Sequence, residues 1–314
     1  MNRLLVALLL CLPMSACQTL GRSDGPHRDV SSAPHAFLLE GDFDNNEQVW
    51  SARESDAVNP VPHVVVSLES TARDDWMLWR VHLDSAPPVD VTWAMHRIAA
   101  NVGVVTLLPH RALVAAPATG EAFDPQQWTP LDACALRGTA TTSGIRVVAN
   151  ADSCTTIAPG IGAQAALLPL AIEREGEWLH LRLYADQARG AQARLDARKV
   201  QMFGGWAAIN GSGPDAGADS KDWHMNRNLR IGNEGGRFAL AWRDGKPSGY
   251  SLELERLTYR DGNVPVLKLS VVDDGSGRTL AYAWANPEAT RIGINLGWVQ
   301  VGLDRAVATR PGSP

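Results

Sequence analysis

Short runs of β-branched, aromatic and leucine residues, interrupted again and again by turn residues, limit the folds open to this chain. In WLHLRLY (178–184) three leucines alternate with polar or aromatic residues, and YSLELERL (250–257) repeats the pattern. A period of two is typical of a strand with one buried face. RDGKPSG (243–249) and DDGSGR (273–278) each separate two such runs, as a hairpin connection would. We therefore expect an all-β protein, either an antiparallel barrel or a sandwich.

Eight runs have strand character: 63–69, 77–84, 144–150, 178–186, 237–243, 250–259, 266–272 and 279–285. Helical character is confined to short segments around 37–43 and 285–293. NGSGPDAGADSKD (210–222) is rich in Gly, Asp and Ser and nearly free of large apolar side chains, which is typical of a linker. It predicts a first β region over 36–209 and a second over 223–314, which either forms a separate domain or closes the first barrel.

The N-terminal segment predicts export. Arg3, an apolar run and a small-residue junction ending in Cys17 resemble a lipoprotein signal, with residues 1–16 removed and Cys17 lipidated. Gln18 after the cysteine favours the outer membrane, with the protein facing the periplasm. Residues 17–35 are polar and rich in Gly, Pro and Ser, which predicts a flexible tether. The alternative is an ordinary secreted protein that is cut elsewhere.

Charge and cysteine usage are consistent with that compartment. The formal net charge is −5 and no run of Lys and Arg is present, which argues against nucleic acid as a partner. Cys134 and Cys154 remain after the leader and the lipidated cysteine are set aside. Two cysteines in an oxidising compartment most simply form a disulfide. The alternative is one reactive thiol and one spare.

No familiar catalytic or metal motif is present. GDFDNNEQ, from Gly41, begins like a calcium loop, but the sixth position from Asp42 is Glu47 where glycine is needed, and the twelfth is Arg53 where glutamate is needed. The histidines lack zinc spacing, and the chain has no nucleophile elbow, P-loop or dinucleotide fingerprint. We therefore expect no metal site, and the catalytic residues, if there are any, stay unassigned.

Tryptophan is the residue type that most suggests a ligand. The eleven Trp outnumber Phe and Tyr together, and several lie in strand-like runs beside charged residues. A lining of Trp with nearby Arg would suit a planar, conjugated, acidic ligand. The alternative is that these tryptophans fill the core of a barrel. The candidates in the strand-like runs are Trp79, Arg80, Trp93, His96 and Arg97.

The first region resembles the CpcT/CpeT-like chromophore lyases, which attach bilins to cysteines of phycobiliproteins. The family's opening Gly-x-Phe-x-Asn-x-x-Gln element is matched by Gly41, Phe43, Asn45 (or Asn46) and Gln48, and its cysteine pair by Cys134 and Cys154. The resemblance implies a lipocalin-like antiparallel barrel with a cavity for an extended bilin. Glu47 and Gln48 would then lie near the barrel mouth as ligand-binding candidates.

These patterns lead to three hypotheses about function. The first is a periplasm-facing lipoprotein that binds a tetrapyrrole-like or other amphipathic ligand in the barrel, with no cofactor required. The second is an envelope structural or interaction lipoprotein with a filled barrel, whose C-terminal β region docks a protein partner. The third is a true bilin lyase. The filled-barrel hypothesis requires Trp79 and Trp93 to be packed on all sides.

Overall fold

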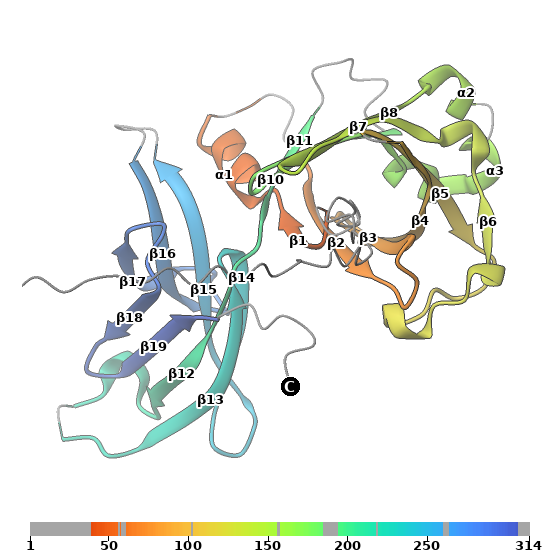
Figure 1. The fold of residues 1–314 in the computed structure, drawn as a ribbon. Coiled ribbons are helices and arrows are strands. Elements are labelled where there is room, and N and C mark those ends of the chain that lie inside the picture. Colours follow the sequence, from red (N-terminus) through yellow and green to blue (C-terminus); the bar gives the residue numbers. More distant parts are fainter. Residues whose placement is uncertain are drawn as a thin grey trace, which may run out of the picture. The chain divides into compact units, whose positions relative to one another are not determined.

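The strands of the first region close into a ring. The computed structural model describes residues 39–306 apart from 56, 58–60, 102, 156–157, 185–193, 218 and 260–263. Ten antiparallel strands form a closed barrel, because β4 pairs with β5 as well as with β3 (Figure 1). The all-β barrel expected from the sequence is confirmed. The expected signal peptide, the tether and Cys17 lie outside the described residues.

The barrel strands are β1 (Gly41–Asp44), β2 (His63–Ser70), β3 (Trp76–Asp84), β4 (Val89–Asn101), β5 (Val104–Ala112), β7 (Leu136–Ala140), β8 (Gly144–Ala149), β9 (Pro169–Glu175), β10 (Trp178–Leu183) and β11 (Leu195–Lys199). A short strand, β6 (Trp128–Pro130), adds to β5. Alternation places Leu179, Leu181 and Leu183 of β10 in the barrel core, as the period of two predicts. Strand β2 supplies Val64, Val66 and Leu68 to the same core.

A second β body follows. Its strands are β12 (Met202–Asn210), β13 (Trp223–Gly232), β14 (Glu234–Ala241), β15 (Pro247–Tyr259), β16 (Val264–Asp273), β17 (Thr279–Ala285), β18 (Arg291–Asn295) and β19 (Val299–Arg305). They form two four-stranded antiparallel sheets, ordered β13-β12-β19-β18 and β14-β15-β16-β17, which share one hydrophobic core. The expected hairpins at 243–249 and 273–278 join β14 to β15 and β16 to β17.

The boundary between the two bodies differs from the expected one. Strand β12 pairs with β13 and β19, so residues 202–209 belong to the second body and the barrel ends with β11. The segment 210–222 joins two paired strands and is not a linker between domains. A Gly- and Asp-rich composition is common to linkers and to long hairpin connections, so composition alone could not separate them.

Helices are few and short among the described residues. They are α1 (Asn46–Glu54), α2 (Ala151–Thr155) and α3 (Ala158–Ile161), with 3-10 turns η2 (Gly120–Ala122), η3 (Pro125–Gln127), η4 (Asp132–Cys134), η5 (Gly162–Leu167) and η7 (Gly213–Asp215). The helical expectation for 37–43 is wrong where that segment is described, because residues 41–43 lie in β1. The expectation for 285–293 is also wrong, because this segment contains the end of β17, a turn over 286–290 and the start of β18. In the part of the chain described, no helix has the length and apolar character needed to cross a membrane.

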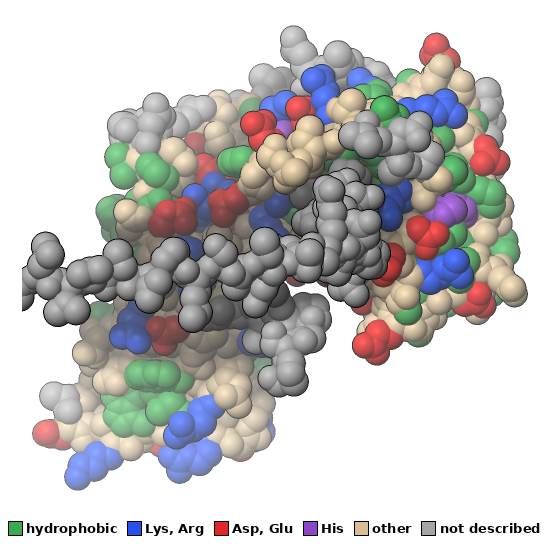
Figure 2. All heavy atoms as spheres, viewed as in Figure 1, with side chains coloured by type: hydrophobic (Ala, Val, Ile, Leu, Met, Phe, Trp, Pro, Cys, Tyr) green, Lys and Arg blue, Asp and Glu red, His purple; other side chains and the backbone are tan. Residues whose placement is uncertain are grey.

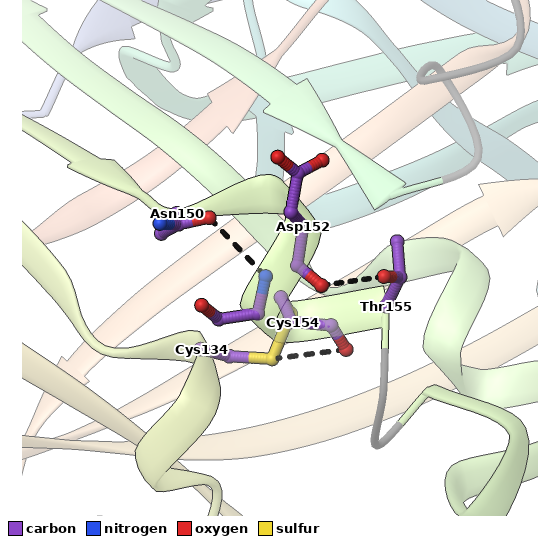
Figure 3. Close-up of a disulfide and its surroundings, with 6 residues drawn as sticks. Cys134, Asn150, Asp152, Cys154 and Thr155 are labelled. Atoms are coloured by element: carbon purple, nitrogen blue, oxygen red, sulfur yellow. Dashed lines mark hydrogen bonds between the residues drawn. A yellow bond between two sulfur atoms is a disulfide. The ribbon is translucent and has the colours of Figure 1, made fainter.

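The expected disulfide is present. Cys134 at the end of η4 is bonded to Cys154 in α2, with the two Cα atoms 4.5 Å apart (Figure 3). The first turn of α2 is held by Asn150, whose carbonyl accepts from the Cys154 amide at 3.0 Å and whose side chain accepts from the Ser153 amide at 3.2 Å. The bond therefore ties together the two segments that flank the β7–β8 hairpin.

Candidate functional site

Of the two alternatives for the tryptophans, cavity lining or core filling, the positions of Trp79 and Trp93 agree with core filling. Trp79 and Trp93 lie directly opposite each other on β3 and β4, and both side chains are fully buried in the barrel core. The Trp93 indole donates to the carbonyl of Leu167 at 3.3 Å. The filled-barrel hypothesis requires both rings to be packed on all sides, and the full burial of Trp79 and Trp93 agrees with that requirement.

Arg97 also points inward, at one end of the barrel. It borders a hollow of about 10 Å³ together with Met77, Met95 and Leu107. That volume is about what one water molecule occupies, whereas sites for small ligands usually measure about 300–1,000 Å³. This hollow is therefore too small to hold a bilin.

Arg80 and His96 lie on the outside of the same strands. The Arg80 guanidinium donates to the carbonyls of Pro117 and Ala118 at 2.9 and 3.0 Å, and it pairs with Glu69 at 3.4 Å. The His96 ring stacks on Trp76, with centroids 4.3 Å apart and planes 5° from parallel. Both residues thus lie beside a small outer cluster of Trp76, Leu78, Ala94, Phe123 and Trp128, in which the chain after β5 covers β3 and β4.

Glu47 and Gln48 lie on α1 and line a different hollow. A groove of about 520 Å³ runs between α1 and the outer surface of β10 and β11, beside which α1 lies in Figure 1. The described residues that form its wall are Glu47, Gln48, Ser51, Ala52, Ser55, Ala57, Val61, Trp178, His180 and Asp196. The structure therefore divides the seven candidates among three places, and only Glu47 and Gln48 line a hollow of ligand size.

The groove floor comes from the polar face of β10. Trp178 and His180 alternate with inward leucines, so both rings face outward, and they are nearly parallel with centroids 6.2 Å apart. His180 Nδ1 lies 2.5 Å from an Asp196 carboxylate oxygen, on the residue directly opposite in β11. A carboxylate bound to one ring nitrogen fixes the orientation of the imidazole and leaves Nε2 for another partner.

Gln48 anchors the helix to the groove floor. Its side-chain amide donates to the carbonyl of Arg194 at 2.8 Å, and its carbonyl accepts from the amide of Asp196 at 3.1 Å. Glu47 pairs with Arg198 of β11 at 3.0 Å, and the Arg198 guanidinium lies 5.3 Å from the centre of the Trp178 ring. These contacts hold the two walls of the groove at a fixed separation.

Charge in and around the groove is balanced. Glu47 is offset by Arg198, and Asp196 by Arg194 at 2.7 Å and by its contact with His180. Figure 2 likewise shows acidic and basic side chains intermingled on the face that it draws. The groove therefore has no large excess of either charge, and the flat face of Trp178 favours a ligand with a planar ring.

The opening element GDFDNNEQ forms a clamp at the start of α1. Asn45 is fully buried; its side-chain carbonyl accepts from the Val64 amide at 2.7 Å and its amide donates to the carbonyl of Pro62 at 2.9 Å. Asp44 accepts from the Asn46 amide at 2.7 Å and lies 2.8 Å from His63 Nε2. The hydrogen bond with Asp44 raises the pKa of His63, although burial opposes the shift.

Sequence patterns indicated part of this site. The alternation in β10 placed Trp178 and His180 on the face opposite the leucines, but nothing in the sequence pairs His180 with Asp196 or places Ser51 beside them. Among the described residues, no group of three or more His, Cys, Asp and Glu is arranged to hold a metal ion. Comparisons with family models, characterised proteins and solved structures found no match.

Proposed function

We propose that this protein is a lipid-anchored binding protein of the outer membrane, facing the periplasm, in which the barrel is a filled scaffold and the ligand occupies the α1 groove. The observation that carries the proposal is the contrast between the two hollows. Arg97 borders a hollow of about 10 Å³ at the end of the barrel. Glu47, Gln48, Trp178 and His180 border a groove of about 520 Å³ beside α1. Only the second lies within the usual range for small-molecule sites.

The chemistry of the groove favours an amphipathic ligand. Trp178 offers a broad apolar face, and Ala52, Ala57 and Val61 add apolar surface along the wall. His180, held by Asp196, supplies a hydrogen-bonding atom at the floor. This set can bind and orient a ring-containing molecule with polar groups on its edge.

Biliverdin, a linear tetrapyrrole, is a suitable probe because it combines flat rings with polar edges. In a calorimetric titration we expect saturable binding by the wild type at micromolar concentration. Trp178→Ala and His180→Ala should each raise the dissociation constant at least tenfold, which corresponds to about 1.4 kcal/mol. Arg97→Ala, at the barrel end, is the matched control and should bind like the wild type.

Two outcomes would contradict this assignment. If Arg97→Ala weakens biliverdin binding and Trp178→Ala does not, the ligand binds inside the barrel and not in the α1 groove. The absence of binding in the wild type would count against a tetrapyrrole-like ligand.

The lipid anchor is tested separately. Palmitate should label the wild-type protein in cells and not the Cys17→Ser variant.

A further inference from the structure

Strand β17 exposes a row of large side chains on one face. Tyr282 and Trp284 are each 57% exposed, and Leu280 precedes them at the same two-residue spacing. Soluble proteins rarely leave several large apolar side chains exposed side by side unless the surface binds something.

The two exposed rings continue into a strip of four aromatic side chains. Trp284 lies 5.2 Å from Tyr282, with planes 28° apart, and 5.6 Å from Tyr259 of β15. Tyr259 in turn lies 5.3 Å from Trp50 of α1. We call Trp50, Tyr259, Tyr282 and Trp284 the aromatic strip.

Polar groups lie beside the rings on the same face of the sheet. Register places Lys268 opposite Trp284 and Ser270 opposite Tyr282. Lys268 pairs with Glu255 at 3.1 Å, and Glu253 lies opposite Ser270 on β15. The Ser270 hydroxyl is fully buried and has no hydrogen-bond partner among the described residues, so Lys268, Glu253 and Glu255 are the polar groups on this face that a ligand can reach.

The composition of this face distinguishes among possible partners. The centre of a protein–protein interface is depleted in Lys, Glu and Ser, all of which occur here beside the rings. Nucleic acid and anionic lipid would require an excess of cations, whereas here Lys268 and Arg237 lie beside three carboxylates, those of Glu253, Glu255 and Asp274. A neutral sugar fits both kinds of group, because its C–H faces can pack on aromatic rings and its hydroxyls can bond to carboxylate, ammonium and hydroxyl groups.

We infer that the aromatic strip on the second β body is a binding site for a neutral glycan chain. The sugar rings pack on Tyr282 and Trp284, and their hydroxyl groups bond to Glu253, Glu255 and Lys268. This site differs from the α1 groove in its chemistry and shares no residue with it, although Trp50 comes from the helix that also lines the groove.

Native gel electrophoresis through immobilised polysaccharide tests this inference. Gels would contain hydroxyethyl cellulose, laminarin or dextran, three neutral glucans with different linkages. We expect at least one of them to retard the wild-type protein, and we expect Trp284→Ala and Tyr282→Ala each to weaken that retardation at least tenfold. Trp206→Ala is the matched control, since Trp206 is 41% exposed on β12 of the same body and should not matter.

The inference is overturned if none of the three glucans retards the wild type, or if Trp284→Ala migrates like the wild type in the retarding gel. Size-exclusion chromatography tests the main competing explanation, which is that the protein self-associates through the aromatic strip. A wild-type dimer that Trp284→Ala converts to a monomer would make the strip a surface for self-association. Equal melting temperatures of wild type and variants are expected, because both rings are exposed.

Discussion

Asn45 links the first strand to the second through its side chain. It is fully buried, and its amide group bonds to the backbone of both Pro62 and Val64 at the start of β2. The next residue, Asn46, is only half-buried, and its side-chain nitrogen has no hydrogen-bond partner among the described residues. Two adjacent asparagines of the same element therefore carry different structural roles.

Asn45→Ala should lower the free energy of unfolding by about 2–4 kcal/mol, because it leaves the Val64 amide and the Pro62 carbonyl buried without their partner. Asn46→Ala should change the free energy of unfolding by less than about 1 kcal/mol, since it removes a group that makes no bond. Urea denaturation of both variants measures the difference. Equal losses would show that the clamp does not depend on the Asn45 side chain.

At the scale of elements, the disulfide fastens two short helical turns that have little core of their own. η4 and α2 contain three and five residues, and in each the cysteine is the buried one. A crosslink between residues 20 positions apart restricts the unfolded chain, which stabilises the folded state by about 3 kcal/mol in the loop-entropy model.

Cys134→Ser should therefore lower the free energy of unfolding by up to about 3 kcal/mol, with a matching fall in melting temperature. Reducing the wild-type protein should produce the same change, and reductant should have no further effect on Cys134→Ser. Thiol titration of unreduced, denatured protein gives an independent check. Free thiols at Cys134 and Cys154 would contradict the bond.

At the scale of the whole molecule, one buried ion pair connects the barrel to the second body. The two bodies cluster into one compact unit. Arg198 of β11 donates from two nitrogens to the two carboxylate oxygens of Glu234 in β14, both at 2.8 Å. Arg256 of β15 pairs with Glu177 at 3.0 Å and with Glu288 at 2.7 Å.

Burial is the largest single influence on the pKa values of both partners in this ion pair. It raises the pKa of Glu234 to about 7, against the opposing hydrogen bonds and charge of Arg198. For Arg198 burial lowers the pKa, but the hydrogen bonds and charges of Glu234 and Glu47 together outweigh burial and raise it. The carboxyl group, and not the guanidinium, therefore responds to pH near neutrality.

Because the folded pKa of Glu234 exceeds its ordinary value of 4.5, the folded state binds the proton more tightly than the unfolded state. Its contribution to stability is complete below pH 4.5 and is lost as the pH rises through 7, a change of about 3 kcal/mol at 1.4 kcal/mol per unit. Because glutamine stays neutral, the unfolding free energy of the wild type minus that of Glu234→Gln should therefore fall between pH 5 and pH 8. A difference that stays constant or grows with pH would contradict this.

The sequence by itself determined the local character of the chain. Alternation in 178–184 predicted the strand and its two faces, and turn residues predicted the hairpins at 243–249 and 273–278. The two cysteines and the expected oxidising compartment predicted the crosslink. These features are local, or follow from composition, so neighbouring residues carry enough information to specify them.

Only the tertiary structure decided which distant residues meet. α1 has a single buried residue, Val49, so its sequence lacks the apolar stripe by which a helix is recognised. The pairing of His180 with Asp196, the placement of β12 in the second body and the inward packing of Trp79 and Trp93 all depend on strand register and barrel closure. Register is a relation between segments far apart in the chain, and a strand's own pattern gives its two faces but not its neighbours.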